Sequence, residues 1–277
     1  MKIKYYLFLG ICMLAAGCGK NDRDVPYVPE ETILTATSSQ VEPESKVGID
    51  EATATTCTWS ENDEISVFTS AGSFKPFVLK SGAGSKTGKF GATLDEGEAV
   101  SDYAVYPAGQ HSFTNGNLKV NLPATYSFVE GVSNIPMVST VNESMLLKFK
   151  HCGGVIRFAI KNITVKGTFV FKCTTHRVTG DFDVDLSGDA PVITAVEDEN
   201  GSTVSISFDK PDSDTNLYYF YVPVPVGSYP DFTIQVINED GTEVMHKTAA
   251  NDKNYVTRGS VLKMRTLTQP TFHGGNE

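Results

Sequence analysis

Several segments of this 277-residue chain combine residue types and spacings that could support binding chemistry. The segment 181–186 has carboxylates at alternate positions, as a calcium-binding loop does. However, Leu186 stands where such a loop needs glycine, and no glutamate follows at the twelfth position. We therefore interpret the alternation as a strand with aspartates outward and apolar residues inward. The glycine-rich segment 82–90 lacks the spacing of a phosphate-binding loop and is interpreted as a flexible turn.

The histidines have no spacing typical of metal ligands, either among themselves or with the cysteines: His111, His151, His176, His246 and His273. The sequence also lacks the Gly-x-Ser-x-Gly motif, and no set of serine, histidine and aspartate can be selected from it. We therefore predict a protein that is not an enzyme and has no catalytic residues, metal ligands or cofactor. A hydrolase whose residues meet only in the fold is the least favoured hypothesis.

The run Leu217–Tyr221 has aromatic rings at four consecutive positions. On a strand, two rings would lie on each face, and exposed rings of this kind are used by sugar-binding surfaces. Tyr218, Tyr219, Phe220 and Tyr221 are therefore a candidate glycan platform. The favoured interpretation is a central strand packed on both faces, and exposure of either alternate pair would favour glycan binding instead.

Cys18 follows a typical export leader. Lys2 and Lys4 precede the apolar run 5–16, which is too short for a permanent transmembrane helix, and the small residues Ala16-Gly17 come directly before the cysteine. The leader resembles that of bacterial lipoprotein precursors, which implies cleavage before Cys18 and a diacylglycerol group on its sulfur. The alternative is an ordinary signal peptide with an incidental cysteine.

The charge balance of the chain is acidic, which disfavours partners that are themselves negatively charged. The precursor has a formal net charge of -10, and loss of Lys2 and Lys4 leaves 21 basic against 33 acidic residues, or -12. Such a charge disfavours nucleic acid and anionic membrane surfaces as partners. Membrane attachment is therefore expected to come from the acyl chains of a lipidated cysteine.

Three cysteines belong to the expected folded body: Cys57, Cys152 and Cys173. An odd number allows at most one intramolecular disulfide, so the chain is not a disulfide-dense scaffold, and the sequence leaves any pairing open. Because Cys57 alternates with Trp59 and Cys152 follows a strand-like run, we interpret both as small buried hydrophobic residues.

These candidate residues must be positioned by strands, because the body of the chain shows period-two or continuous apolar patterning rich in β-branched and aromatic residues. The clearest predicted strands are 63–68, 118–122, 155–160, 203–208 and 232–237. Hairpin-type loops are predicted at 115–117, 199–201 and 239–241. No stretch has convincing helical periodicity. We predict an all-β fold built from antiparallel β-sandwiches.

The length and the composition suggest two domains. After cleavage 260 of the 277 residues remain, which is comfortable for two modest cores. A break is most plausible near Asn142-Glu143. The predicted organisation is a signal peptide at 1–17, a lipidated cysteine with a flexible tether at 18–31, β-sandwiches at 32–142 and 143–270, and a tail at 271–277.

Five segments, in order, resemble the fimbrillin family of Bacteroidetes lipoproteins: 58–68, 103–107, 135–137, 147–151 and 254–262. The resemblance covers roughly residues 32–267 and implies two tandem transthyretin-like β-sandwich domains. It further implies a surface-exposed protein held in the outer membrane by lipid, which serves as a shaft, anchor or tip subunit of fimbriae in adhesion. The acidic tether after Cys18 resembles the export signal that sends such lipoproteins to the cell surface.

The same resemblance implies assembly with other fimbrial subunits by strand addition. In shaft subunits an arginine-specific protease removes the first strand, and the vacated groove accepts a strand from the next subunit. Here the candidate first strand is 32–37 and the loop after it contains Lys46, whereas no arginine lies between Arg23 and Arg157. Lys46 is therefore the candidate processing site, and the missing arginine favours a subunit that keeps its lipid as an anchor, or a surface protein that does not polymerise.

Two landmarks have structural interpretations. Trp59, the only tryptophan, is expected to anchor the first sandwich with its indole N–H bound to a partner. Gly259 is expected to give backbone freedom before a last strand that points Leu262 and Met264 inward. The leading functional hypothesis is a lipid-anchored fimbrial subunit, whose adhesion partner is a host or bacterial surface ligand or glycan. The alternative hypothesis is a glycan-binding surface lipoprotein.

Overall fold

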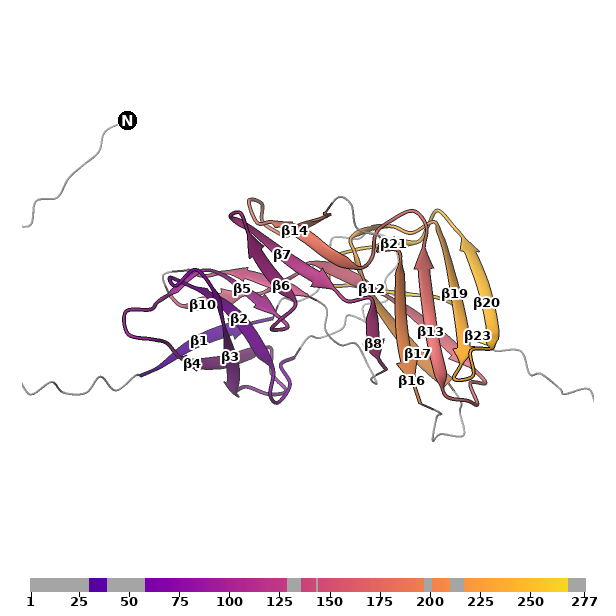
Figure 1. Cartoon of the computed structure of the whole chain (residues 1–277), viewed down its shortest axis with the longest axis horizontal. Coiled ribbons are helices and arrows are strands. Elements are labelled where there is room, and N and C mark those ends of the chain that lie inside the picture. Colours follow the sequence, from indigo (N-terminus) through magenta and orange to yellow (C-terminus); the bar gives the residue numbers. More distant parts are fainter. Residues whose placement is uncertain are drawn as a thin grey trace, which may run out of the picture.

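The structure is a computed structural model that describes residues 30–38, 58–128, 136–142, 144–196, 201–209 and 217–268. Every regular element in these ranges is a strand, which confirms the predicted all-β class (Figure 1). The strands form several sheets, and those of the N-terminal and C-terminal halves lie toward opposite ends of the long axis (Figure 1). No helix in these ranges is long and apolar enough to cross a membrane.

The largest sheet has the strand order β10-β1-β4-β3-β2-β5-β9-β11. Its strands are β1 (Glu31–Thr37), β2 (Glu64–Thr69), β3 (Phe74–Ser81), β4 (Thr87–Thr93), β5 (Val100–Tyr106), β9 (Met137–Thr140), β10 (Leu146–Lys148) and β11 (Lys150–His151). The terminal strands β10 and β11 are separated in sequence only by Phe149. The segment 146–151 therefore brings the two ends of the sheet together, and the sheet curves around its own core.

This curved sheet encloses a core in which apolar side chains alternate with outward polar ones, as the period-two pattern requires. Trp59 is the largest buried side chain, with ring centroids 5.0 Å from Phe90, 5.4 Å from Tyr106 and 5.6 Å from Phe149, all edge-on. Its indole Nε1 donates a hydrogen bond to the carbonyl of Ala36 over 3.3 Å. The predicted structural role of Trp59 is confirmed.

Two further sheets pack face to face at the C-terminal end. One has the order β17-β12-β22, with β23 also paired to β12; the other has the order β20-β19-β13-β16-β8. Their strands are β8 (Thr125–Ser127), β12 (Gly153–Lys161), β13 (Gly167–Cys173), β16 (Thr203–Phe208), β17 (Leu217–Pro225), β19 (Asp231–Asn238), β20 (Glu243–Ala250), β22 (Val261–Lys263) and β23 (Leu267–Thr268). Stacked rings such as Phe169 and Phe220, 4.5 Å apart, fill the space between them.

A smaller sheet joins strands from both halves of the chain in the order β15-β14-β7-β6. These strands are β6 (His111–Thr114), β7 (Asn117–Leu122), β14 (Gly180–Asp185) and β15 (Val192–Ala195), and a short pair, β18 (Gly227–Ser228) with β21 (Tyr255–Val256), lies apart from it. Val120 and Phe182, which are direct neighbours in this sheet, are both buried in a third apolar cluster.

Backbone pairing crosses the predicted boundary near Asn142 at several places. β1 pairs with β10, β7 pairs with β14, and β8 pairs with β16. The two largest core clusters nevertheless separate along the chain: the buried members of one run from Leu34 to Phe149 and those of the other from Ile156 to Val256. The division into two sandwiches at this boundary stays a prediction.

The local predictions agree closely with the strands that form. The predicted strand 203–208 is β16 exactly as expected, and the other predicted strands agree within one or two residues. Asn115 and Gly116 have positive φ angles of 54° and 82° and form the two-residue hairpin between β6 and β7, as their sequence predicts. The loop 239–241 connects β19 to β20, whereas most of the loop predicted at 199–201 lies outside the described residues.

Cys152 and Cys173 are both buried and free, and Cys57 lies outside the described residues. Burial raises the pKa of the Cys152 thiol to about 12, so it stays protonated at neutral pH and behaves as a small apolar group. The interpretation of Cys152 as a buried hydrophobic residue is confirmed.

Candidate assembly site at the first strand

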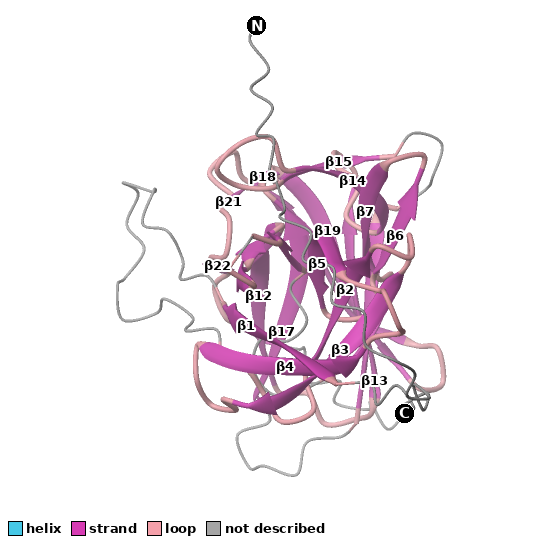
Figure 2. Ribbon diagram, turned by 90° about the vertical axis from the view of Figure 1, so that its left-hand side faces the viewer, coloured by secondary structure: helices cyan, strands magenta, loops and turns pink. Residues whose placement is uncertain are grey.

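The first strand occupies an interior position in the curved sheet. All seven residues of β1 pair antiparallel with β4, and Thr35, Ala36 and Thr37 also pair in parallel with Leu146, Leu147 and Lys148 of β10. The N-terminal end of the described structure is thus inserted between two strands, one of them more than a hundred residues later in the sequence. Figure 2 shows β1 beside β4 on the end of the molecule that faces the viewer.

Backbone hydrogen bonds hold both ends of this insertion. The Thr35 N–H donates to the Met145 carbonyl over 3.3 Å, and the Phe149 N–H donates to the Thr37 carbonyl over 2.9 Å. Ser38 continues the contact by donating its N–H to the Lys86 carbonyl over 2.9 Å. Without β1, the partner groups on β4 and β10 would be left unpaired, and unpaired buried backbone groups are costly.

The side chains of β1 alternate between the core and the surface. Leu34 and Ala36 are completely buried, whereas Ile33 is 42% exposed. Leu34 lies opposite Phe90 in the pairing register, and both belong to the core around Trp59. Two separate features therefore bind the strand. Backbone hydrogen bonds hold it whatever its sequence, and pockets for the alternate apolar side chains set its register.

Glycines on β4 shape the place where β1 lies. A Cβ atom added to Gly91 would come within 2.8 Å of the Ile33 Cδ1 atom, and one added to Gly88 would come within 2.9 Å of the Trp59 ring. A larger residue at Gly88 would displace the Trp59 ring, whereas one at Gly91 would displace the ends of flexible side chains such as that of Ile33. An ion pair between Lys80 and Glu31, 2.7 Å long and half-exposed on both sides, lies at the start of the strand and adds little.

The residues predicted to carry lipidation and processing cannot be placed against this groove. Cys18 and Lys46 both lie outside the described residues, so both assignments stay predictions. The described structure resumes at Thr58, directly before Trp59, whose indole binds the backbone of β1.

The aromatic run lies on β17 and divides between the two faces of its sheet. Tyr218 and Phe220 are buried in the C-terminal core, whereas Tyr219 is 40% exposed. The expected central strand is wrong, because within the described residues β17 pairs with β12 alone and is an edge strand. The Arg157 guanidinium lies over the Tyr219 ring, 4.9 Å from its centroid. A glycan platform on the outer face stays a prediction.

The other sequence candidates are structural. Residues 82–86 form the turn from β3 to β4, with positive φ at Gly82 and Gly84, whereas residues 87–90, which were also expected in this turn, belong to β4. Asp181–Asp185 lies in β14 with Phe182 buried. Within the described ranges no three or more histidine, cysteine or acidic side chains gather as a metal site would require. His273 lies outside these ranges.

His151 is a buried titratable group that sequence reasoning did not single out. Burial, with a contribution from the nearby Arg258 charge, lowers its pKa to about 4. Arg258 also donates from Nη1 to the His151 carbonyl over 2.7 Å, and a Cβ atom on Gly259 would come within 2.8 Å of the imidazole. The positive φ of 63° at Gly259 agrees with its predicted freedom, but the contact with His151 spans over a hundred residues and leaves no local signal.

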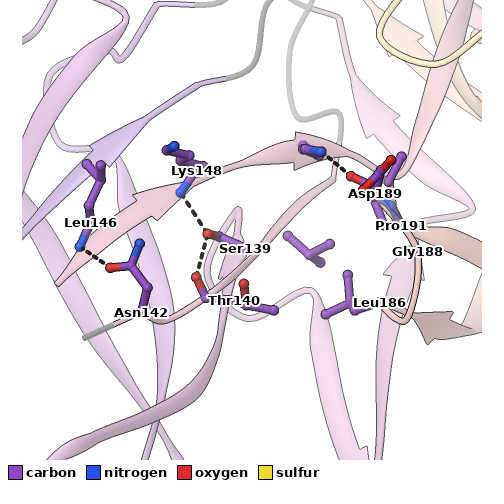
Figure 3. A pocket seen from close by; sticks show the side chains of 12 residues that line it. Ser139, Thr140, Asn142, Leu146, Lys148, Leu186, Gly188, Asp189 and Pro191 are labelled. Carbon is purple, nitrogen blue, oxygen red and sulfur yellow. Dashed lines mark hydrogen bonds between the residues drawn. The ribbon is translucent and has the colours of Figure 1, made fainter. Parts of the chain in front are cut away.

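A small polar hollow lies between β9, β10 and the loop 186–191 (Figure 3). Its volume is about 220 Å³, and its polar groups are largely satisfied by one another. The Lys148 N–H donates to the Ser139 hydroxyl over 2.8 Å, and that hydroxyl donates to the Thr140 carbonyl over 2.9 Å. The Lys150 ammonium donates to the Asp189 carbonyl. The first of these bonds joins β10 to β9, and the last joins β11 to the loop 186–191, so we assign the hollow a structural role.

Comparison with known proteins gives the fold but no family. No family model matches the sequence, and no curated protein matches it. The structure resembles a proposed cell adhesion protein from Bacteroides ovatus, with a TM-score of 0.50 and 11% identity over 87% of this chain and 93% of that one. A proposed cell adhesion protein from Bacteroides fragilis also matches, with a TM-score of 0.38 and 9% identity over 87% and 95% of the two chains. This all-β arrangement is therefore shared with at least one solved structure.

Proposed function

We propose that this chain is a lipid-anchored cell-surface subunit of fimbriae that assembles by β-strand addition. Its own first strand fills the groove for an added strand until a cut after that strand releases it. The observation that carries the proposal is the seating of β1 between β4 and β10, with Leu34 and Ala36 buried in the core. The export leader before Cys18 supports the surface location, and the fold shared with a proposed cell adhesion protein supports a role in adhesion.

The geometry gives strand exchange a physical basis. Release of β1 would expose the backbone groups of β4 and β10 together with the seats of Leu34 and Ala36. An extended segment from another subunit, with apolar residues at alternate positions, would restore both kinds of contact. Reburial of a leucine side chain contributes about 1.5–3 kcal/mol, in addition to the backbone ladder.

Whether the chain is cut at Lys46 determines if the subunit keeps its first strand and its lipid. While the chain is intact, β1 stays covalently tethered, the groove is filled and the lipid on Cys18 holds the molecule in the membrane. Cleavage at Lys46 would turn β1 into a separate fragment that another strand can replace. Because no arginine is present between Arg23 and Arg157, we propose that the intact anchor is the principal form.

A specific cut can test exchange directly. In a Lys46→Arg variant of the full chain, an arginine-specific protease has one target between residues 24 and 156. We expect the cut protein to take up a labelled peptide of residues 30–38, and to reject the same peptide with aspartate at the Leu34 and Ala36 positions. Uncut protein is the control and should bind neither peptide. Equal retention of both peptides, or no uptake by the cut protein, would contradict the proposal.

The anchor itself is tested in native cells. Mass spectrometry of the mature N-terminus should show an acylated cysteine at position 18. A start near Val47 would instead indicate a processed shaft subunit, and an unmodified start near Cys18 would contradict the lipid anchor.

A glycan-binding surface lipoprotein is a second candidate, favoured by the exposure of Tyr219 beside Arg157. Aromatic faces flanked by a cation suit sugar rings that carry a carboxylate. A glycan array probed with the wild type and with Tyr219→Ala tests this hypothesis. Binding that is lost in the variant would support it, whereas an array without signal would remove it.

A further inference from the structure

An open cleft lies at one side of the C-terminal pair of sheets, away from the first strand. It runs between the edge strand β20 of one sheet and β22 and β23 of the other. Its volume is about 520 Å³, within the range of small-molecule sites. The proposed exchange of β1 does not involve this cleft.

The cleft is open because two inward positions of β20 carry residues that do not fill the space between the two sheets. Ala249 lies opposite Phe232 in the pairing register, and Lys247 lies opposite Ile234. The small alanine leaves space between the sheets, and the lysine places an ammonium group at the cleft. The floor is apolar and is formed by core residues of both sheets: Phe158, Phe232, Ile234, Leu262, Met264 and Leu267.

A buried polar group in the cleft lacks a partner. Asn254 is only 5% exposed, and its side-chain Nδ2 has no hydrogen-bond partner. Its backbone is fixed, because its N–H donates to the Asn251 carbonyl over 3.1 Å and its carbonyl accepts from the Tyr229 N–H over 2.6 Å. An unpaired buried amide costs about 1–3 kcal/mol, and this one lies beside the end of the cleft that is away from Lys247.

The charged residues in the lining of the cleft are all basic, and Lys247 is the one with an inward register on β20. Lys247, Lys263 and Arg265 line it, whereas its lining contains no acidic residue. None of the three forms an ion pair within the described residues. This is a local reversal in a chain with a formal net charge of -10, and it selects an anionic group.

The shape of the cleft indicates an elongated ligand. It follows β20 and the turn after it from Lys247 to Asn251, a distance of about 13 Å at the rise of an extended chain. We propose that the cleft binds an elongated aliphatic carboxylate, with its carboxylate at the Lys247 ammonium and its chain along the apolar floor toward Asn254. Carboxylates accept charge-assisted hydrogen bonds from such groups.

A different reason for an inward lysine on an edge strand is protection against edge-to-edge pairing with another chain. That reason explains the charge of Lys247, but it explains neither the unpaired amide of Asn254 nor the apolar floor beside it. The two readings also differ in what a neutral residue at position 247 would change.

Calorimetric titration of the full chain with dodecanoate tests the site. Dodecanol, which lacks the charge, and acetate, which lacks the apolar chain, serve as ligand controls. We expect saturable binding of dodecanoate at one site, with weaker binding of dodecanol and none of acetate. Lys247→Gln should lower the affinity for dodecanoate about three- to tenfold. Ala249→Phe, which fills the cleft, should abolish binding.

Lys172→Gln is the matched control, because Lys172 is an exposed lysine on β13 of the same sheet. Its affinity for dodecanoate should equal that of the wild type. Binding by the leader would leave the affinity unchanged in Lys247→Gln and Ala249→Phe as well. Equal affinity in Lys247→Gln and Lys172→Gln would overturn the proposal. Equal binding of dodecanol and dodecanoate would also overturn it. Concentration-dependent association of Lys247→Gln without any change in affinity would assign Lys247 to edge protection.

Discussion

The first strand and the strand pair β12–β17 are both held by backbone pairing, but they contribute very differently to the cores they join. β1 supplies two completely buried apolar side chains, Leu34 and Ala36, to the N-terminal core. In contrast, β12 and β17 pair over nine residues each and supply seven buried side chains to the C-terminal core: Ile156, Phe158, Ile160, Tyr218, Phe220, Val222 and Val224. Loss of β1 would therefore expose less apolar surface than loss of β12 and β17.

Position in the chain reinforces this contrast. β1 begins the described structure, so its release requires only one cut after it. β12 and β17 lie inside the C-terminal half, and β12 also pairs with β22 and β23. Under the proposed strand addition, β1 is the part of the N-terminal sheet that would be replaced, while the C-terminal sheets would keep all their strands.

Deletion of residues 30–38 should have the largest effect, and it should destabilise the N-terminal sheet more than the C-terminal sheets. We expect β4 and β10 to lose protection from hydrogen exchange, because both lose their partner strand. Protection in β12 and β17 should persist. Loss of protection in both regions would show that the two cores unfold as one unit. Addition of a peptide of residues 30–38 is the control and should restore protection.

Phe220→Ala should be the most damaging single substitution in the C-terminal sheets. The ring is completely buried and contacts Phe169, Phe208, Tyr218 and Phe128. Truncation of a buried phenylalanine costs about 3–5 kcal/mol, measurable by denaturant unfolding. Tyr219→Ala, at the exposed neighbouring position, is the matched control and should cost much less. Similar losses in the two variants would contradict the assigned faces of β17.

Acidification should lower the free energy of unfolding through protonation of the buried His151. The pKa of the folded imidazole is about 4, whereas the unfolded value is near 6.5, so the unfolded chain binds protons first as the pH falls. The stabilisation is therefore complete above pH 6.5 and is lost toward pH 4, by about 3 kcal/mol. Burial also lowers the pKa of His111, which adds a change of the same sign.

His151→Gln separates these two contributions. The variant should show a shallower loss of stability between pH 6.5 and 4 than the wild type, in thermal or denaturant unfolding. His111→Gln is the comparison and should flatten the profile less, because His111 is less buried than His151. An unchanged slope in His151→Gln would show that the imidazole is protonated in the folded chain.

Trp59→Phe should loosen the first strand without removing it. The variant loses the hydrogen bond from Nε1 to the Ala36 carbonyl and part of the ring volume, at a cost of about 2 kcal/mol. We expect faster hydrogen exchange at β1 and easier uptake of a competing peptide after cleavage. An exchange rate equal to that of the wild type would mean that the backbone ladder alone holds the strand.

Glu31→Gln should have the smallest effect, because its ion pair with Lys80 is half-exposed. Such pairs contribute less than about 1 kcal/mol, and salt reduces the contribution further. Unfolding at low and high salt checks this expectation. A larger loss would show that the start of β1 is held more firmly than its exposure suggests.

The predictable parts of this structure are those encoded by local patterns. Period-two alternation was sufficient for β2, β16 and β19, and the Asn115-Gly116 pair was sufficient for the hairpin that it forms. Leu262 and Met264 pack on the C-terminal core as their alternation predicts.

The parts that could not be predicted depend on partners distant in sequence. Nothing near Thr35 indicates that β10, over a hundred residues later, lies beside it in parallel. The run at Tyr218–Tyr221 looks like a central strand because both faces are aromatic, but the pairing that makes β17 an edge strand is set by the whole sheet. The partnerless amide of Asn254 becomes visible only when the two sheets are assembled.

The insertion of β1 between β4 and β10 also determines how a chain of such subunits would bear load. A tensile force along the axis of an inserted strand acts in shear on every hydrogen bond of its ladder at once, across all seven residues paired with β4. Peeling from one end would break these bonds one after another at lower force. A strand seated between two neighbours would therefore act as a mechanical joint that resists traction along a fibre, although a single proteolytic cut is enough to free it.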